Sequence, residues 1–99
     1  MKDTKSWSHK HDFPIEEIYV TYKTIAGLIV PRLRAFKSLK KHGYPSDIND
    51  TLWEQAIQKM IDAFELLSDA NNYSYTSDEE KIINEGLDLF RKYYRDLWD

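Results

Sequence analysis

The sequence predicts an all-α domain: a small antiparallel bundle of three to four helices with the C-terminal helix at its centre. Apolar residues recur at helical spacing from Ile15 to the end of the chain, and no stretch shows the alternation of a β-strand. The chain has 99 residues, of which 41% are hydrophobic and 31% charged, which is typical of one small globular unit. We expect an N-terminal tail over residues 1–13 and a single helical domain over residues 14–99.

The first helix is expected to begin at Pro14, because a proline at the first helical position loses no hydrogen bond. The residues predicted for its core face are Ile15, Ile18, Tyr19, Tyr22, Ile25, Ala26 and Ile29. Pro31 interrupts this pattern by removing a backbone N–H donor. The segment is therefore either one kinked helix or two helices, and we favour a separate second helix or a sharp kink at Pro31.

The segment that follows Pro31 is basic. Its cations lie opposite a continuing apolar face, and they are Arg32, Arg34, Lys37, Lys40 and Lys41. These five are candidate nucleic-acid-binding residues, because Lys and Arg neutralise phosphates irrespective of base sequence. The alternative is that they pair with carboxylates of later helices. The formal net charge of −3 favours this second interpretation.

A third helix is predicted to begin near residues 50–51, where Thr51 and Glu54 match a capping box. Its predicted apolar face consists of Trp53, Ala56, Ile57, Met60, Phe64 and Leu67. The opposite face is acidic, and its candidate protein-binding residues are Glu54, Asp62, Glu65 and Asp69. Such a stripe either meets a basic partner surface, where charge speeds and orients association, or is simply a solvated helix face.

The last helix is predicted to begin at a second capping box, Ser77 to Glu80, and to run to the C-terminus. Its apolar residues cover about half of the helical circumference, which is wider than the stripe of a surface helix. It should therefore touch two neighbours, or one neighbour and a partner chain. Tyr94 and Trp98 are the candidates for the partner contact, and a homodimer is one form of it. Gly86, in mid-helix, predicts the close approach of another helix.

Catalytic and metal-binding patterns are missing from the sequence. The absence of cysteine excludes disulfides and thiol chemistry. The histidines are His9, His11 and His42, and none follows a Glu at the spacing used by metal sites in bundle cores. No phosphate-binding loop or nucleophile elbow is present. We therefore expect no enzymatic activity, no cofactor and no metal.

Location is predicted from the apolar runs of the chain. The longest run, Ile25 to Val30, is far too short to span a membrane. No apolar stretch follows Met1 as an export signal would require. We expect a cytoplasmic protein with no membrane partner.

Two stretches, residues 51–65 and residues 85–99, resemble small uncharacterised α-helical proteins of tailed bacteriophages and prophages. These end in a similar Gly-Leu-x-Leu-Phe…Tyr…Leu-Trp-Asp string, here from Gly86 to Asp99. The resemblance implies a helical fold and a viral setting, and it transfers no functional residue.

The function expected on this basis is that of a non-enzymatic phage accessory protein. It would bind a host or phage protein and inhibit or adapt it, as an anti-CRISPR-type or other counter-defence inhibitor does. The alternatives are a DNA- or RNA-binding accessory protein that uses the basic second helix, and a small virion-assembly or packaging component.

Overall fold

The computed structural model describes residues 7–8, 13–14, 20–39 and 44–97. The helices are α2 (Thr21–Ser38), α3 (Asp50–Ser68) and α4 (Ser77–Tyr93), and the 3-10 turn η1 (Tyr94–Asp96) follows α4. Two short antiparallel strands, β1 (Trp7–Ser8) and β2 (Phe13–Pro14), pair in the segment expected to be a tail. The prediction of a helical domain is confirmed.

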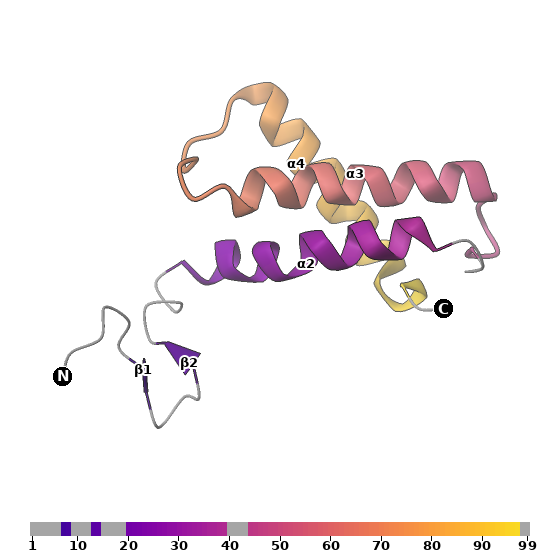
Figure 1. Ribbon diagram of the computed structural model, residues 1–99. Coiled ribbons are helices and arrows are strands. Elements are labelled where there is room, and N and C mark those ends of the chain that lie inside the picture. The colour runs from indigo at the N-terminus through magenta and orange to yellow at the C-terminus, as the bar shows by residue number, and fades with distance from the viewer. Residues whose placement is uncertain (1–6, 9–12, 15–19, 40–43, 98–99) are drawn as a thin grey trace.

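The three helices pack in an order that differs from the expected one. Figure 1 shows α2 and α3 side by side with opposite chain directions, while α4 crosses α3 obliquely. Helix α3 contacts both neighbours, whereas α2 and α4 have almost no contact with each other. The central helix is therefore α3, and the prediction that the C-terminal helix is central is wrong.

Helix α3 is central because most of its apolar side chains are covered by other helices, whereas two of those on α4 are exposed. Helix α3 buries residues over a broad arc: Trp53, Ala56, Ile57, Met60, Ile61, Ala63 and Phe64. Helix α4 has fewer apolar residues than α3, and it buries only Ile83, Gly86 and Tyr93. Ile82 and Leu87 of α4 are 41% and 38% exposed. A wide apolar arc thus did not identify the central helix, because part of that arc faces solvent.

Helix α2 is continuous through Pro31, so the preference for a separate second helix is wrong. Pro31 and Gly27 are both exposed, and nothing lies within 4 Å of the position where a Cβ on Gly27 would stand. The proline ring therefore meets no side chain four residues earlier, which removes part of the usual steric cost. The expected start at Pro14 is also wrong, because Pro14 lies in β2. Residues 15–19 lie outside the described residues.

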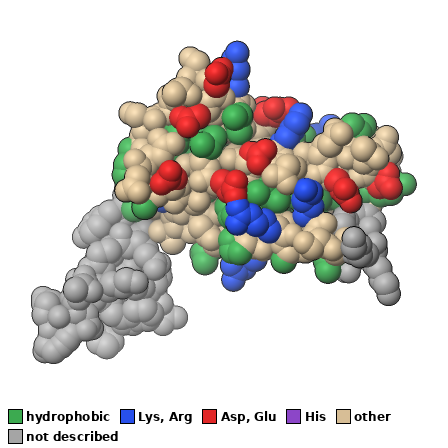
Figure 2. Space-filling model, turned by 45° about the horizontal axis from the view of Figure 1, so that its top comes forward, with side chains coloured by type: hydrophobic (Ala, Val, Ile, Leu, Met, Phe, Trp, Pro, Cys, Tyr) green, Lys and Arg blue, Asp and Glu red, His purple; other side chains and the backbone are tan. Residues whose placement is uncertain are grey.

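The buried face of α2 is also rotated from the predicted one. Ala26 is buried as expected, but Tyr22 and Ile25 are 45% and 48% exposed. The buried positions are Lys23, Ala26, Val30 and Leu33. Figure 2 shows hydrophobic side chains projecting along the lower edge of the described part of the molecule. Both sides of α2 are apolar, so its periodicity could not select the side that meets α3.

Helices α3 and α4 begin at Asp50 and Ser77, as predicted, but their capping residues lie one or two positions before the expected ones. The side chain of Asn49 caps α3 by accepting a hydrogen bond from the Leu52 N–H at 2.8 Å. Thr76 and Glu79 form the capping box of α4 in place of Ser77 and Glu80. Asn, Ser and Thr are nearly equivalent as caps, so composition alone does not decide among adjacent candidates.

Gly86 is the point at which α4 crosses α3. A Cβ atom on Gly86 would overlap the side chain of Ala63 and would lie 2.6 Å from the carbonyl oxygen of Lys59. The predicted close approach of another helix at Gly86 is therefore confirmed. Hollows lie between α3 and α4 on the two sides of this crossing.

Candidate protein-binding surfaces

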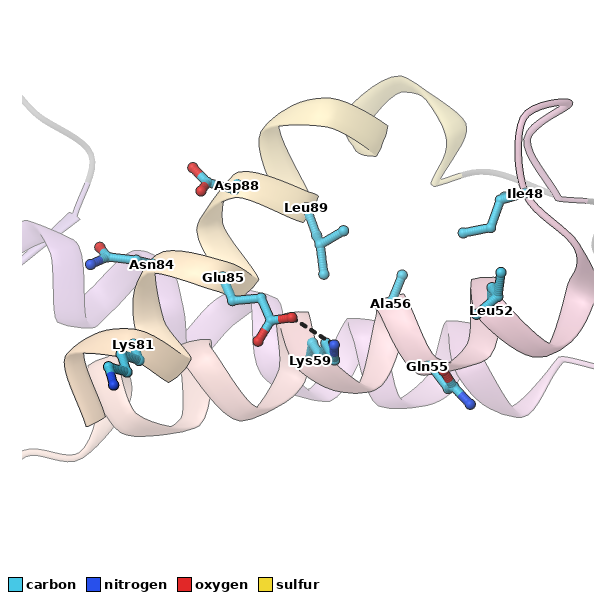
Figure 3. A pocket seen from close by; sticks show the side chains of 10 residues that line it. All are labelled: Ile48, Leu52, Gln55, Ala56, Lys59, Lys81, Asn84, Glu85, Asp88 and Leu89. Atoms are coloured by element: carbon cyan, nitrogen blue, oxygen red, sulfur yellow. Dashed lines mark hydrogen bonds and ion pairs between the residues drawn. The ribbon is translucent and has the colours of Figure 1, made fainter. Parts of the chain in front are cut away.

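The larger hollow is an open groove of about 580 Å³ between α3 and α4. Apolar side chains from the N-terminal half of α3, the preceding loop and the second half of α4 line it: Ile48, Leu52, Ala56 and Leu89. Figure 3 shows these four side chains facing one another across the groove. An ion pair between Lys59 Nζ and Glu85 Oε2 at 2.6 Å closes one end.

Sequence reasoning missed this groove because Leu52 lies off the predicted core face of its helix. Leu52 is 48% exposed, and Leu89 is partly buried. The only sequence signal is a leucine one position before the first core residue, Trp53. The divergence of two crossing helices, which creates the groove, leaves no local pattern.

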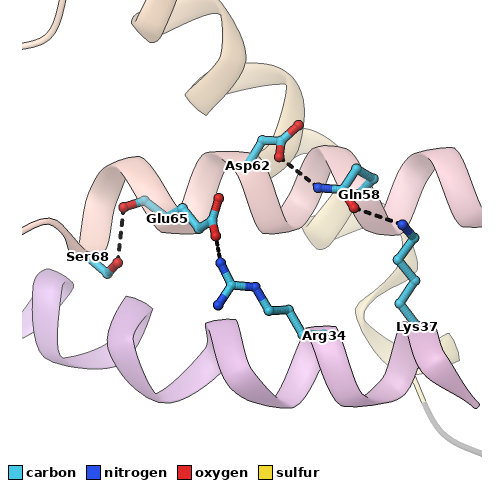
Figure 4. Close-up of polar contacts among 6 residues, drawn as sticks. All are labelled: Arg34, Lys37, Gln58, Asp62, Glu65 and Ser68. Carbon is cyan, nitrogen blue, oxygen red and sulfur yellow. Dashed lines mark hydrogen bonds and ion pairs between the residues drawn. The ribbon is translucent and has the colours of Figure 1, made fainter.

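Two of the basic candidates contact side chains on the acidic side of α3. Arg34 forms an ion pair with Glu65, and Lys37 Nζ donates a hydrogen bond to Gln58 Oε1 at 2.8 Å (Figure 4). Gln58 Nε2 in turn donates to Asp62 Oδ1 at 2.8 Å. The interpretation that the basic segment pairs with later helices is confirmed for Arg34, and Lys37 reaches the acidic stripe through an amide.

The acidic candidates do not form one uninterrupted charged face. Asp62, Glu65 and Asp69 border a hollow of about 270 Å³ together with Leu66 and Ile82. Each of these carboxylates has a partner, and that of Asp69 accepts a hydrogen bond from the Asn71 N–H at 2.9 Å. The fourth candidate is separate from them.

That fourth candidate, Glu54, borders a different hollow, beside Trp53 and Tyr44. The indole Nε1 of Trp53 has no hydrogen-bond partner among the described residues. The linker residues 40–43, which include the candidates Lys40 and Lys41, lie outside those residues.

The remaining candidates are Arg32, Tyr94 and Trp98. Arg32 is exposed and donates to the carbonyl oxygen of Leu28 at 2.7 Å. Tyr94 is 63% exposed, and its ring packs edge-on against Phe90 at a centroid distance of 5.3 Å. Trp98 lies outside the described residues. A partner contact through Tyr94 and Trp98 stays a prediction.

Lys23 is a buried cation that sequence reasoning did not single out. Its Nζ donates to the carbonyl oxygens of Leu67, Asp69 and Asn72 at 3.0, 2.6 and 2.7 Å. The tyrosine rings around the ammonium are those of Tyr22, Tyr73 and Tyr75. The ammonium thus caps the C-terminal end of α3, where backbone carbonyls lack helical partners and the helix dipole is negative. We call this arrangement the Lys23 clamp.

The Lys23 clamp shifts the titration of its members. Burial disfavours the charged ammonium, but the Tyr75 hydrogen bond and the nearby tyrosines outweigh it, so the pKa of Lys23 lies above its ordinary 10.5. Burial also raises the pKa of Tyr75. A group that holds its proton more tightly in the folded state stabilises that state below its unfolded pKa, and this contribution is lost as pH rises through the folded pKa.

Lys23→Met is expected to lower the melting temperature at neutral pH far more than Lys59→Met does. The first variant removes three ammonium–carbonyl hydrogen bonds at a part-buried site, whereas the second removes an exposed ion pair, which contributes little. Above about pH 10.5, the ordinary pKa of lysine, wild-type stability should fall more steeply than that of Lys23→Met, because only wild type loses the ammonium. Thermal melts followed by circular dichroism measure both effects. Equal melting temperatures for the two variants would contradict the assignment.

Metal and membrane sites are not supported by the parts of the chain that the structure describes. Among those residues, no group of three or more His, Asp or Glu side chains is placed to hold a metal ion. His9, His11 and His42 lie outside them. Within the same ranges, no helix combines the length and the apolar character needed to cross a membrane.

Comparison with known proteins adds no further identification: no family model, no curated protein and no solved structure matches this chain.

Proposed function

We propose that this chain is a non-enzymatic protein-binding module whose α3–α4 groove takes an apolar helical segment of a partner protein. The observation that carries the proposal is the groove itself, in which Leu52 stays 48% exposed in a domain with a small core. Exposed apolar surface of this kind is costly in water and marks interaction sites in soluble proteins. Following the phage resemblance, the partner is a host or phage protein that the module inhibits or adapts.

The composition of the groove suits a helix from another protein. Its floor is formed by Ile48, Ala56 and Leu89, and its rim carries polar groups such as Gln55 and Asn84. An apolar centre with a polar rim is the usual anatomy of a protein interface. A helix that lies in such a groove buries one apolar face and leaves its polar face in water.

Nucleic-acid binding, the first alternative, has less support from the geometry. It would require five basic residues, of which Arg34 and Lys37 are engaged with side chains of α3. Glu65 and Asp62 lie beside them and would repel a phosphate. A virion-assembly role, the other alternative, uses the same kind of protein contact and differs in the identity of the partner.

The proposal is tested by affinity capture from a bacterial lysate treated with nuclease, followed by mass spectrometry. We expect a specific protein to be retained by wild type and by the control variant Leu87→Lys. We expect Leu52→Lys to lose it, because a charge in an apolar interface costs at least about tenfold in affinity. Both side chains are exposed in the free chain, so both variants should fold, which circular dichroism checks. Equal capture by the two variants, or capture that nuclease abolishes, would overturn the proposal.

A further inference from the structure

A second apolar surface lies on the side of α2 that faces away from α3. We call it the outer α2 stripe, and its apolar members are Ile25, Leu28 and Ala35. Ile25 and Leu28 are 48% and 54% exposed, and Ala35 is exposed as well. The hydrophobic side chains along the lower edge of Figure 2 follow this part of the molecule.

The spacing of the outer α2 stripe is that of a helix-pairing seam. Together with Arg32, its members recur at alternating intervals of three and four residues, which is the a and d pattern of a heptad repeat. The stripe extends over about 15 Å, which corresponds to roughly three turns of a partner helix.

The charge of α2 determines which partner helix fits. The helix contains four cations and no Asp or Glu. Lys23, Arg34 and Lys37 are engaged with α3 or with the turn that follows it. Arg32 lies in the stripe itself, and among the described residues its guanidinium donates to the backbone carbonyl oxygen of Leu28 and to no carboxylate. A partner helix therefore needs apolar residues at its own seam and a carboxylate opposite Arg32.

We infer that the outer α2 stripe is a second docking surface, which binds an acidic amphipathic helix of a protein partner. It is separate from the α3–α4 groove, because no residue of α2 lines that groove. A chain with both surfaces joins two protein segments, and it would act as an adaptor. The inference does not depend on the groove, since different residues carry it.

Two other occupants fit the stripe less well. Pairing with the α2 helix of a second copy would bring another Arg32 and no carboxylate to meet it. A membrane-surface helix keeps its cations beside the apolar face, where they meet lipid headgroups. Here Arg32 lies within the stripe, between Leu28 and Ala35, so insertion would carry a guanidinium into the acyl region.

The test uses two synthetic amphipathic peptides of about 21 residues, three heptads with Leu at a and d and either Glu or Lys at e and g. Binding of each labelled peptide to the whole chain is measured by fluorescence anisotropy. We expect the Glu peptide to bind at least about tenfold more tightly than the Lys peptide. Arg32→Glu should reverse that preference. Ile25→Gln combined with Leu28→Gln should abolish binding of the Glu peptide, whereas the matched exposed-site control Leu87→Gln should leave it unchanged.

Four results would overturn the inference. One is equal binding of the two peptides, and another is binding that survives the Ile25→Gln and Leu28→Gln changes. A third is a wild-type dimer in light scattering that these changes convert to a monomer, which would assign the stripe to a second copy. The fourth is sedimentation with vesicles of phosphatidylglycerol and phosphatidylcholine that the same changes abolish. Circular dichroism of each variant checks that α2 is still folded.

Discussion

Phe64→Ala is expected to lower the free energy of unfolding by about 3–5 kcal/mol. Phe64 is 5% exposed and lies in the core where α3 meets its neighbours. Its ring packs edge-on against Phe90 at a centroid distance of 4.9 Å. Truncation removes the transfer free energy of the ring and leaves a cavity that two crossing helices cannot close. A domain has only about 5–15 kcal/mol in total, so the variant should unfold at a much lower denaturant concentration than wild type.

The control for this prediction is Phe90→Ala, which removes the same atoms from a partly buried position on α4. It should cost less than Phe64→Ala, because fewer neighbours surround the ring. The double variant should cost about 0.5–1.5 kcal/mol less than the sum of the single changes, since each single change already destroys the edge-on contact. Denaturant titrations followed by circular dichroism give the three values. A Phe64→Ala protein as stable as wild type would show that α3 does not bury this face.

Gly86→Ala and Gly27→Ala are expected to change stability in opposite directions, although both replace a glycine inside a helix. At Gly27 the new methyl group meets open space, so the restriction of the unfolded chain should stabilise the protein by about 0.5–1 kcal/mol. At Gly86 the methyl group would overlap Ala63 and press on the Lys59 carbonyl oxygen. Backbone atoms cannot rotate away, so α4 must move off α3 at a cost of about 1–3 kcal/mol.

The comparison is made by measuring the melting temperature of wild type and of both variants under one condition. The shift should be upward for Gly27→Ala and downward for Gly86→Ala. Gly86→Val should melt lower still, because a branched side chain adds further overlap. A stabilised Gly86→Ala protein would mean that α4 does not cross α3 at this residue, and the α3–α4 groove would then lack its geometric basis.

The sequence by itself determined the helical class, the core face of α3 and the close approach at Gly86. Each of these rests on local chemistry. The residues from Trp53 to Phe64 are apolar on one side and polar on the other, so only one side can face the core. A glycine in the middle of a helix destabilises that helix relative to alanine, so its presence indicates a close packing contact. At Gly86 this contact is with α3.

Only the tertiary structure decided which helix is central, which side of α2 is buried and where the candidate surfaces lie. Helical periodicity shows how apolar side chains are distributed around one helix, and it does not show which neighbour covers them. Tyr22 and Ile25 belong to the same predicted apolar face as Ala26, yet they are largely exposed to solvent. The Lys23 clamp joins residues that are 44 to 52 positions apart, and no local pattern encodes such contacts. The groove likewise exists only because two helices cross at one point and diverge.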